Sequence, residues 1–370
     1  MKTLKNKIFI TQPSLPPIRE FTKIFSKSWE SKMLTNNSDL CKEFEAKLAD
    51  YLGVKFISVI NNATTALIIA QRALGFKGEV ITSPYSFIAT AHSIKWNGYK
   101  PVFVDTDKHY GNILVSKVSE AINKNTGGIL ATHNYGFPGE LQKMETLSQK
   151  NNIPLLYDGA PSIGVNINGK SILHFGDMSV LSFHATKIFT TFEGAAVISK
   201  NQTLKNRVDK LRNFFIEGNN PIPDIGINGK MNEASAAMGL LQLKYLDKNI
   251  SKRENIFKKY CSHFSRLEQL KCITIPSNLD YNYSYFPIFF NKGFRAREKM
   301  FRILLENDIV CRRYWYPLIS NQPVYKNEKT FSLDNALALS KSVICLPIYP
   351  DLTDSETDKI IKIIKENYIC

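Results

Sequence analysis

Two residues of opposite charge stand at the ends of short apolar runs in this chain. Asp158 closes the run IPLLYD, and Lys187 follows the run 178–183. A lysine amine can condense with an aldehyde to form a Schiff base, and a carboxylate can keep a ring nitrogen protonated. Each residue alone has a simpler explanation, because Asp158 could cap a helix and Lys187 is one lysine among many.

A third segment adds a site for an anion. Asn62, Ala63, Thr64 and Thr65 follow the apolar run KFISVI and open a predicted helix. Backbone N–H groups and threonine hydroxyls at a helix N-terminus suit a phosphate, although an ordinary N-cap uses the same residue types. A phosphate site, an acid and a lysine in this order are what pyridoxal phosphate requires. The sequence therefore predicts this cofactor, with the lysine as the catalytic residue.

The elements that must position these residues alternate along the first half of the chain. Apolar runs of strand length occupy residues 55–60, 78–83, 100–105, 127–133, 153–158 and 178–183. Segments 64–74 and 140–150 have the helical spacing of apolar residues. This alternation predicts an α/β fold with a mostly parallel sheet, in which ligands collect at the carboxyl ends of the strands.

The pattern changes after about residue 221. We predict a long helix over 232–267, an irregular segment over 273–290, and an amphipathic helix after Thr353, where Thr353 and Glu356 supply capping groups. We also predict two domains, a large cofactor-binding domain over residues 1–249 and a smaller α/β domain over residues 250–370.

Composition narrows the function classes. The 370 residues carry a net charge of +15, but the lysines are spread along the chain without a dense basic stripe. Solvated faces explain this charge best; a nucleic-acid-binding protein is the alternative, and a basic surface would also attract an acidic substrate. The six cysteines and six histidines lack metal-ligand spacing, so we expect no metal. No secretory signal or membrane span is evident, and we expect a cytoplasmic protein.

Several long motifs resemble one family over nearly the whole chain. They are SPYSFIATAHSIKWNGYKPVFVDTD, HNYGFPGE, DGAPSIGV, GDMSVLSFHATKIFTTFEGAAVI and GINGKMNEASAAMGLLQL. The chain resembles the DegT/DnrJ/EryC1/StrS sugar aminotransferases. The resemblance implies a fold-type I pyridoxal-phosphate transferase, like aspartate aminotransferase, with pyridoxamine phosphate as the aminated form of the cofactor. It also implies a homodimer.

The resemblance carries roles over residue by residue. Lys187 matches the lysine that holds the cofactor aldehyde, and Asp158 matches the partner of the ring nitrogen. Phe87 matches an aromatic residue that stacks on the ring. Phosphate contacts are implied for Ser182, Thr64 and Thr65, and for Asn228 and Lys230 reaching across the dimer interface. His133 and His184 lie in matching motifs without an assigned role.

Three motifs depart from the family pattern. Pro161 stands where the family has a glutamine that donates a hydrogen bond towards the cofactor's phenolic oxygen, so that contact must be lost or supplied elsewhere. The family's Ser-Gly-Thr at the phosphate site is Asn62-Ala63-Thr64 here. Phe192 and Ala195 replace glycines.

The resemblance also implies a substrate. We expect transfer of an amino group from L-glutamate to a nucleotide-linked keto-deoxysugar, with dTDP-4-keto-6-deoxyglucose first and a UDP-linked 4-keto or dTDP-linked 3-keto sugar as alternatives. Arg313 and Tyr316 are candidate sugar-nucleotide contacts, although a surface turn is an equal explanation. A desulfurase, a catalytically inactive cofactor-binding protein and a nucleic-acid-binding protein are the rival classes.

Overall fold

A seven-stranded sheet forms the centre of the computed structural model, which describes residues 7–368. Its strand order is β2-β10-β9-β6-β5-β3-β4. The strands are β2 (Phe56–Ile60), β3 (Glu79–Thr82), β4 (Lys100–Phe103), β5 (Thr126–Thr132), β6 (Leu155–Asp158), β9 (Met178–Ser182) and β10 (Ala195–Ser199). Only β10 runs against its neighbours, so the sheet is mixed and the predicted α/β fold class is confirmed.

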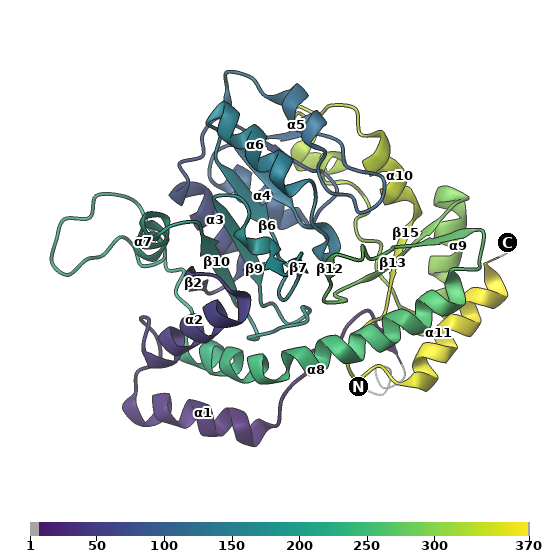
Figure 1. Cartoon of the computed structure of the whole chain (residues 1–370), viewed down its shortest axis with the longest axis horizontal. Helices are drawn as coiled ribbons and strands as arrows, with labels where there is room; N and C mark the ends of the chain where they lie inside the picture. Colours follow the sequence, from purple (N-terminus) through teal and green to yellow (C-terminus); the bar gives the residue numbers. More distant parts are fainter. Residues whose placement is uncertain (1–6, 369–370) are drawn as a thin grey trace.

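Helices cover both faces of this sheet (Figure 1). One face packs against α3 (Ala63–Ala73) and α7 (Gln202–Leu211), through residues such as Val180 and Val197. The alternate residues Leu181 and Ala196 face α2 (Asp39–Leu52) and the start of α8 (Glu233–Phe264). Strands that are buried on both faces read as continuous apolar runs, which is why the runs could be recognised in the sequence.

Three more helices flank the sheet where the sequence alternates. They are α4 (Ile88–Trp96), α5 (Val115–Ala121) and α6 (Leu141–Asn151). An N-terminal helix, α1 (Ile18–Ser31), packs along α8 (Figure 1). Short 3-10 turns cover Asn134–Gly136, Ile172–His174, Ile319–Asn321 and Pro323–Tyr325.

The C-terminal part contains its own three-stranded antiparallel sheet, in the order β11-β13-β15. It consists of β11 (Leu270–Cys272), β13 (Phe286–Phe290) and β15 (Val343–Leu346), with α9 (Gly293–Glu306), α10 (Asp334–Ser342) and α11 (Asp354–Asn367). The prediction of an irregular segment over 273–290 is therefore wrong for its last residues, because β13 forms the middle strand there. The prediction at α11 is confirmed, because Thr353 and Glu356 form a capping box.

Small pairings tie distant segments together. β1 (Ile8–Phe9) pairs with β14 (Ile309–Val310), and β12 (Leu279–Asp280) pairs with β7 (Asn166–Ile167), which also pairs with β8 (Lys170–Ser171). Helix α8 continues through residue 250, from the large sheet to the C-terminal part (Figure 1). The predicted boundary at residues 249–250 falls inside this helix and stays a prediction.

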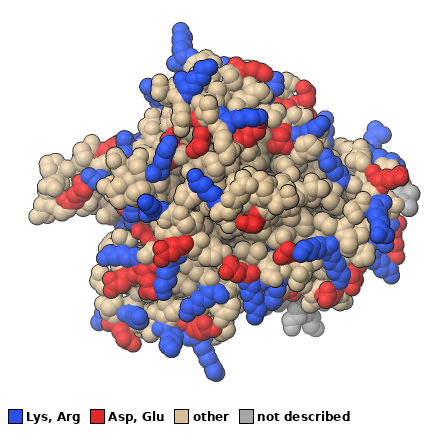
Figure 2. All heavy atoms as spheres, in the orientation of Figure 1, with Lys and Arg blue, Asp and Glu red and all other residues tan. Residues whose placement is uncertain are grey.

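The surface mixes both signs of charge. On the face drawn in Figure 2, Lys and Arg alternate with Asp and Glu rather than forming one basic band. Within residues 7–368, no helix has the length and apolar character of a membrane span, and no three His, Cys, Asp or Glu side chains group as metal ligands. Cys41, Cys261, Cys272, Cys311 and Cys345 are free thiols.

Candidate active site

Strand direction brings the predicted chemistry to one edge of the sheet. The register pairs Thr132 with Asp158, and Ser182 with Ala195, which in turn pairs with Ile60. The carboxyl ends of β2, β5, β6 and β9 therefore share this edge. A cavity of about 510 Å³, which we call the Lys187 cavity, opens there. Its lining includes Thr64, Phe87, Asp158, Ser182, Lys187 and Tyr285.

Asp158 is a buried carboxylate at the end of β6. Its Oδ2 accepts a hydrogen bond from the Thr90 hydroxyl (2.7 Å), and its Oδ1 accepts one from the Ala160 N–H (3.2 Å). Burial raises the pKa of Asp158, while these two donors and the charge of Lys187 oppose the rise. A cationic group placed in the cavity would compensate this buried charge.

Lys187 lies in the loop between β9 and β10. Its backbone N–H donates to the carbonyl of His184 (2.8 Å), which closes a turn. Its Nζ donates to the hydroxyl of Tyr285 (3.0 Å). The loop thus presents a primary amine to the same cavity as the carboxylate, as the sequence predicted.

The phosphate end of the cavity begins at helix α3. Asn62 caps this helix, and its Oδ1 accepts a hydrogen bond from the Thr65 N–H (2.9 Å), so the ordinary cap is present. Thr64 lines the cavity, whereas Thr65 does not. Ser182, almost fully buried at the end of β9, also lines it. A helix N-terminus with two hydroxyls beside it is a suitable environment for a phosphate.

Aromatic side chains form one wall. Phe87 precedes α4 with 56% of its surface exposed, and its ring lies 5.8 Å from that of Trp315. The Trp315 Nε1–H donates to Asn134 Oδ1 (2.7 Å), which holds the indole in place. An exposed aromatic face at the cavity fits the stacking role that the resemblance implies.

Two histidines line the same cavity. His133 is buried and its ring stacks on Tyr157 (4.4 Å between centroids). Burial lowers the pKa of His133 to about 3, although an interaction with the backbone of Ile172 opposes the shift. Its imidazole is therefore neutral at ordinary pH. His184 is exposed and its Nδ1 lies 2.8 Å from the Thr186 hydroxyl.

The departures from the family pattern have local explanations. The side chain of Pro161 has no donor, and its carbonyl accepts hydrogen bonds from Asn282 Nδ2 (2.7 Å) and the Ser284 hydroxyl (3.0 Å). The glutamine contact is thus absent at this position. Phe192 has a φ of 67°, a left-handed conformation that favours glycine. This explains why a glycine is usual there.

Two predicted phosphate contacts lie away from the Lys187 cavity of their own chain. Lys230 Nζ donates to Asn213 Oδ1 (2.8 Å) and sits over the Phe214 ring (5.2 Å). The Asn228 carbonyl accepts a hydrogen bond from Asn61 Nδ2 (3.2 Å). Neither residue lines the cavity.

The two predicted sugar contacts line a smaller neighbouring cavity of about 260 Å³. This cavity shares Ser86, Phe87, Tyr314 and Trp315 with the Lys187 cavity. Arg313 Nη1 donates to both carboxylate oxygens of Glu298 (2.8 and 3.0 Å), and its guanidinium lies over the Tyr316 ring. An acidic neighbour therefore already neutralises much of the Arg313 charge.

Sequence reasoning missed Thr90 and Tyr285. Thr90 lies in the motif SPYSFIATAHS, and a hydroxyl in this motif was the only available signal. Tyr285 comes from a segment 98 residues after Lys187, and no local pattern points to it.

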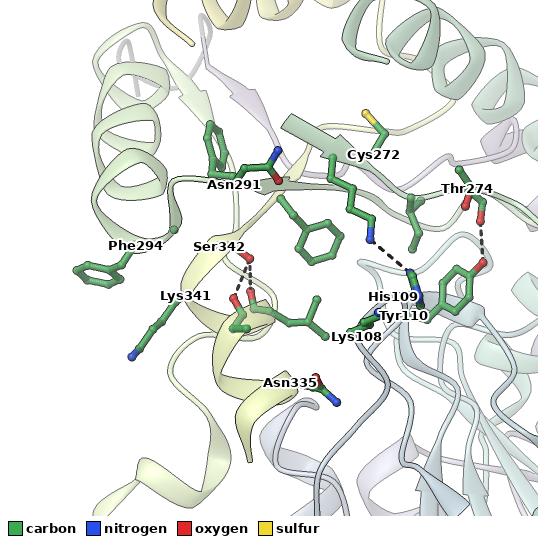
Figure 3. A pocket seen from close by; sticks show the side chains of 17 residues that line it. Lys108, His109, Tyr110, Cys272, Thr274, Asn291, Phe294, Asn335, Lys341 and Ser342 are labelled. Atoms are coloured by element: carbon green, nitrogen blue, oxygen red, sulfur yellow. Dashed lines mark hydrogen bonds between the residues drawn. The ribbon is translucent and has the colours of Figure 1, made fainter. Parts of the chain in front are cut away.

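A third cavity, of about 380 Å³, lies between the loop 108–110 and the C-terminal sheet (Figure 3). We call it the Lys271 cavity; its lining includes Lys108, His109, Lys271, Phe289, Leu339 and Lys341. Lys271 Nζ lies 3.3 Å from His109 Nδ1, and the Tyr110 hydroxyl donates to the carbonyl of Thr274 (3.0 Å). Among residues 7–368, no carboxylate side chain lines this cavity.

The donors around the Lys187 cavity fit pyridoxal phosphate. An amine, a buried carboxylate, a helix N-terminus with hydroxyls and an exposed aromatic face match its aldehyde, ring nitrogen, phosphate and ring, respectively. The Thr132 hydroxyl, buried at the cavity, has no hydrogen-bond partner within residues 7–368, so it is free for a ligand.

Comparison with known proteins decides the family. The sequence model described as the DegT/DnrJ/EryC1/StrS aminotransferase family matches residues 18–365. The chain belongs to this family. It is 42% identical to a dTDP-4-amino-4,6-dideoxy-D-glucose transaminase of Shigella dysenteriae, over 98% of this chain and all of that protein. A transaminase of the same name from Escherichia coli is 41% identical over 96% of this chain and 97% of its own.

Solved structures agree with this membership. DesI, analysed in the presence of its TDP-sugar product, superposes with a TM-score of 0.94 at 26% identity, over 98% of this chain and 93% of its own. Helicobacter pylori PseC superposes with a TM-score of 0.91 at 27% identity, over 98% and 99%. This member of the DegT/DnrJ/EryC1/StrS family is a pyridoxal-phosphate-dependent aminotransferase with a fold-type I architecture. The predicted family, fold class, enzyme class and cofactor are confirmed.

Proposed function

We propose that this aminotransferase moves an amino group from L-glutamate to dTDP-4-keto-6-deoxyglucose, giving dTDP-4-amino-4,6-dideoxyglucose. One observation carries the chemistry: the Lys187 amine and the buried Asp158 carboxylate face a single cavity at the carboxyl edge of the sheet. The names of the two transaminases at 42% and 41% identity support the sugar.

Residues at different places around the Lys187 cavity have proposed roles in holding the cofactor. Lys187 holds its aldehyde, and Asp158 pairs with the protonated ring nitrogen. Phe87 covers one face of the ring. Thr64, Thr65 and Ser182 bind the phosphate; because the Thr65 backbone N–H donates to Asn62 Oδ1, Thr65 contributes its hydroxyl. When bound, pyridoxal phosphate supplies an aldehyde that carries the amino group and a ring that takes up electrons.

Lys187 also performs the proton transfers. As a free amine, its Nζ takes the proton from the α-carbon of glutamate, and in the second half-reaction it returns a proton to the sugar carbon that receives the amine. Asp158 stays ionised while it faces the positive ring nitrogen, because that charge offsets its burial. The aromatic wall at Phe87 and Trp315 limits the access of water.

The neighbouring cavity is the proposed site of the sugar nucleotide. Tyr316 and Trp315 offer aromatic faces to a base or sugar ring. Arg313 contributes a guanidinium that Glu298 holds in a fixed orientation. Because the two cavities share Phe87 and Trp315, a sugar bound next to them would reach the cofactor.

We further propose a homodimer in which Asn228 and Lys230 bind the phosphate in the partner's cavity. Both follow the loop 214–227, which projects beside α7 in Figure 1 and exposes apolar side chains. Ile225, for example, is 76% exposed. An exposed apolar cluster on a protein of this size marks an interaction surface. Light scattering should give twice the mass of the chain, and Lys230→Ala should weaken cofactor binding about tenfold, as loss of a charged contact does.

The cellular setting extends this proposal. A dTDP-linked amino sugar would serve surface polysaccharide synthesis, such as the O-antigen of lipopolysaccharide, in the cytoplasm. UDP-linked sugars are the main competitor, because a relative at 32% identity is the Campylobacter jejuni UDP-4-amino-4,6-dideoxy-N-acetyl-beta-L-altrosamine transaminase.

The test is a substrate screen with the purified holoenzyme. dTDP-4-keto-6-deoxyglucose, a dTDP-linked 3-keto isomer and a UDP-linked 4-keto sugar are each incubated with glutamate. The mass and amine position of the product are then read by mass spectrometry and NMR. Turnover of the dTDP-4-keto sugar is expected to be the fastest; preference for the UDP sugar would overturn the substrate while leaving the enzyme class intact.

A further inference from the structure

Tyr285 brings a hydroxyl from the C-terminal part of the chain into the Lys187 cavity. It immediately precedes β13, the middle strand of the small sheet. Its hydroxyl oxygen accepts a hydrogen bond from Lys187 Nζ at 3.0 Å. Within residues 7–368, it is the single hydrogen bond of the Lys187 amine. Neither composition nor the site residues predicted from sequence pointed to this contact.

Hydrogen bonds made by two nearby residues fix the position of this hydroxyl. Asn282 Nδ2 donates to the carbonyls of Pro161 (2.7 Å) and Ile163 (2.8 Å). The Ser284 hydroxyl lies within hydrogen-bond distance of the Pro161 carbonyl (3.0 Å) and of Asn282 Oδ1 (2.7 Å). These bonds attach the segment before β13 to the loop that follows Asp158. Tyr285, the next residue, is thereby directed towards the lysine.

Two tyrosine rings also pack against the ring of Tyr285. Tyr135 packs against it with 5.8 Å between ring centroids, and Tyr314 packs edge-on at the same distance. Aromatic pairs in these orientations are favourable. The backbone carbonyl of Tyr314 in turn accepts hydrogen bonds from the hydroxyls of Tyr85 and Tyr135. The phenol therefore has little freedom to rotate away from Lys187.

A hydroxyl suits a lysine that must act as a base. A neutral amine has two N–H bonds and one lone pair, so donating one N–H to Tyr285 restricts the directions in which the lone pair can point. A carboxylate at the same place would bind the ammonium through a stronger, charge-assisted bond and would keep the proton on it. The neutral phenol orients the amine without this effect.

We propose that Tyr285 is a positioning residue that orients the Lys187 amine during proton transfer. The inference rests on the proposed role of Lys187 as the proton-transferring base. It also links the small C-terminal sheet to the reacting atoms, because the residue that orients the lysine is the one that leads into β13.

The test compares Tyr285→Phe with Tyr283→Phe. Tyr283 lies two residues away on the same segment but outside the Lys187 cavity, which makes it the matched control. Cofactor-free protein is labelled with an amine-reactive reagent across a pH series, and labelling at Lys187 is quantified by mass spectrometry. Loss of the hydroxyl removes the hydrogen bond to the Lys187 amine, so the pH dependence of labelling at Lys187, read as its midpoint, should differ between Tyr285→Phe and wild type. Tyr283→Phe should leave the midpoint unchanged.

Kinetics of the holoenzymes provide the second measurement. Tyr285→Phe should lower kcat about 10- to 100-fold, as misorientation of a reacting group does, with little change in KM for glutamate. Ser284→Ala keeps the phenol but removes the hydroxyl that contacts the Pro161 carbonyl and Asn282 Oδ1, and should show a smaller change in the same direction. A smaller loss of kcat in Ser284→Ala would support the proposal even if Tyr285→Phe folds poorly.

Three results would overturn the proposal: an unchanged midpoint and kcat in Tyr285→Phe, equal changes in the Tyr283→Phe control, or wild-type behaviour of Ser284→Ala together with a misfolded Tyr285→Phe. Borohydride reduction separates this failure from failure of the proposed function. An adduct at Lys187 in wild type leaves the role of the lysine intact, whereas its absence there removes that role first.

Discussion

The Lys187 cavity and the Lys271 cavity both place a lysine against a ring-bearing side chain. Lys187 donates to the Tyr285 hydroxyl at 3.0 Å, and Lys271 lies 3.3 Å from His109 Nδ1. The volumes are also comparable, about 510 and 380 Å³. A hollow with a lysine in it is therefore not enough to identify a reacting site.

The lining residues distinguish the two. The Lys187 cavity lies where several parallel strands end, and it contains the buried carboxylate of Asp158. The Lys271 cavity lies between a loop, strands β11 and β13 and α10, and its lysines are exposed (Figure 3). Sheet edges at which strands converge hold several polar groups rigidly at once, whereas a loop junction leaves its charges to solvent. The buried acid opposite the amine is the deciding feature.

Replacing each lysine tests this comparison with the largest expected effect. Lys187→Ala should lower turnover about 10³-fold or more, because the covalent contact and the base are lost together. Lys271→Ala should stay within about twofold, as expected of an exposed residue. Steady-state rates with glutamate and the keto sugar provide the measurement. Similar losses in both variants would remove the distinction between the cavities.

Removing the charge of the buried acid should have the next largest effect. Asp158→Asn keeps the shape of the side chain but no longer holds a proton on the ring nitrogen. Turnover should fall on the order of 10²-fold, at the lower end of contributions from positioned ionisable groups. The absorption spectrum of the bound cofactor should change as well. A variant with wild-type turnover and spectrum would contradict the pairing of Asp158 with the ring.

The smallest effect concerns the stability of the cofactor-free protein. Burial raises the pKa of Asp158 above its ordinary value of 3.8, so the folded chain holds this proton more tightly than the unfolded chain. The contribution of this group to the free energy of unfolding therefore falls as the pH rises from about 3.8 through the folded-state pKa.

Asp158→Asn lacks that dependence. Its free energy of unfolding relative to wild type should increase with pH over this window, as measured by denaturant titration of the two cofactor-free proteins. A difference that is constant with pH would show that the carboxylate is not held in an unfavourable environment.

Much of the large sheet could be predicted because its strands are buried on both faces and read as apolar runs. Asp158 and Ser182 end such runs, so their convergence followed from strand direction alone. Strand β10 was missed, although it is an apolar run that is buried along its length. It returns antiparallel after the loop that carries Lys187. Strand β13 contains Pro287, although proline is unfavourable in a central strand. It is tolerated because pairing with β11 stops at Ile288, so Pro287 pairs with β15 alone.

Site residues could be predicted where they follow a recognisable strand. They could not be predicted where tertiary packing brings them in from a distant segment. Lys187 and Phe87 line the cavity as expected, whereas Thr65 does not. Asn228 and Lys230, expected in the partner's cavity, and Arg313 and Tyr316, expected at the sugar nucleotide, lie outside it. Tyr285 and Thr90 reach the site through tertiary packing, which no local spacing encodes. The roles of all these residues remain predictions.

The central claim is that Lys187 is the amine that holds the cofactor aldehyde. Its most direct test is borohydride reduction of the yellow holoenzyme, followed by digestion and mass spectrometry across all lysines. We expect the pyridoxyl mass on the peptide that contains Lys187 and on no other peptide. A pyridoxyl group on the Lys271 peptide, or none on the Lys187 peptide, would contradict the account.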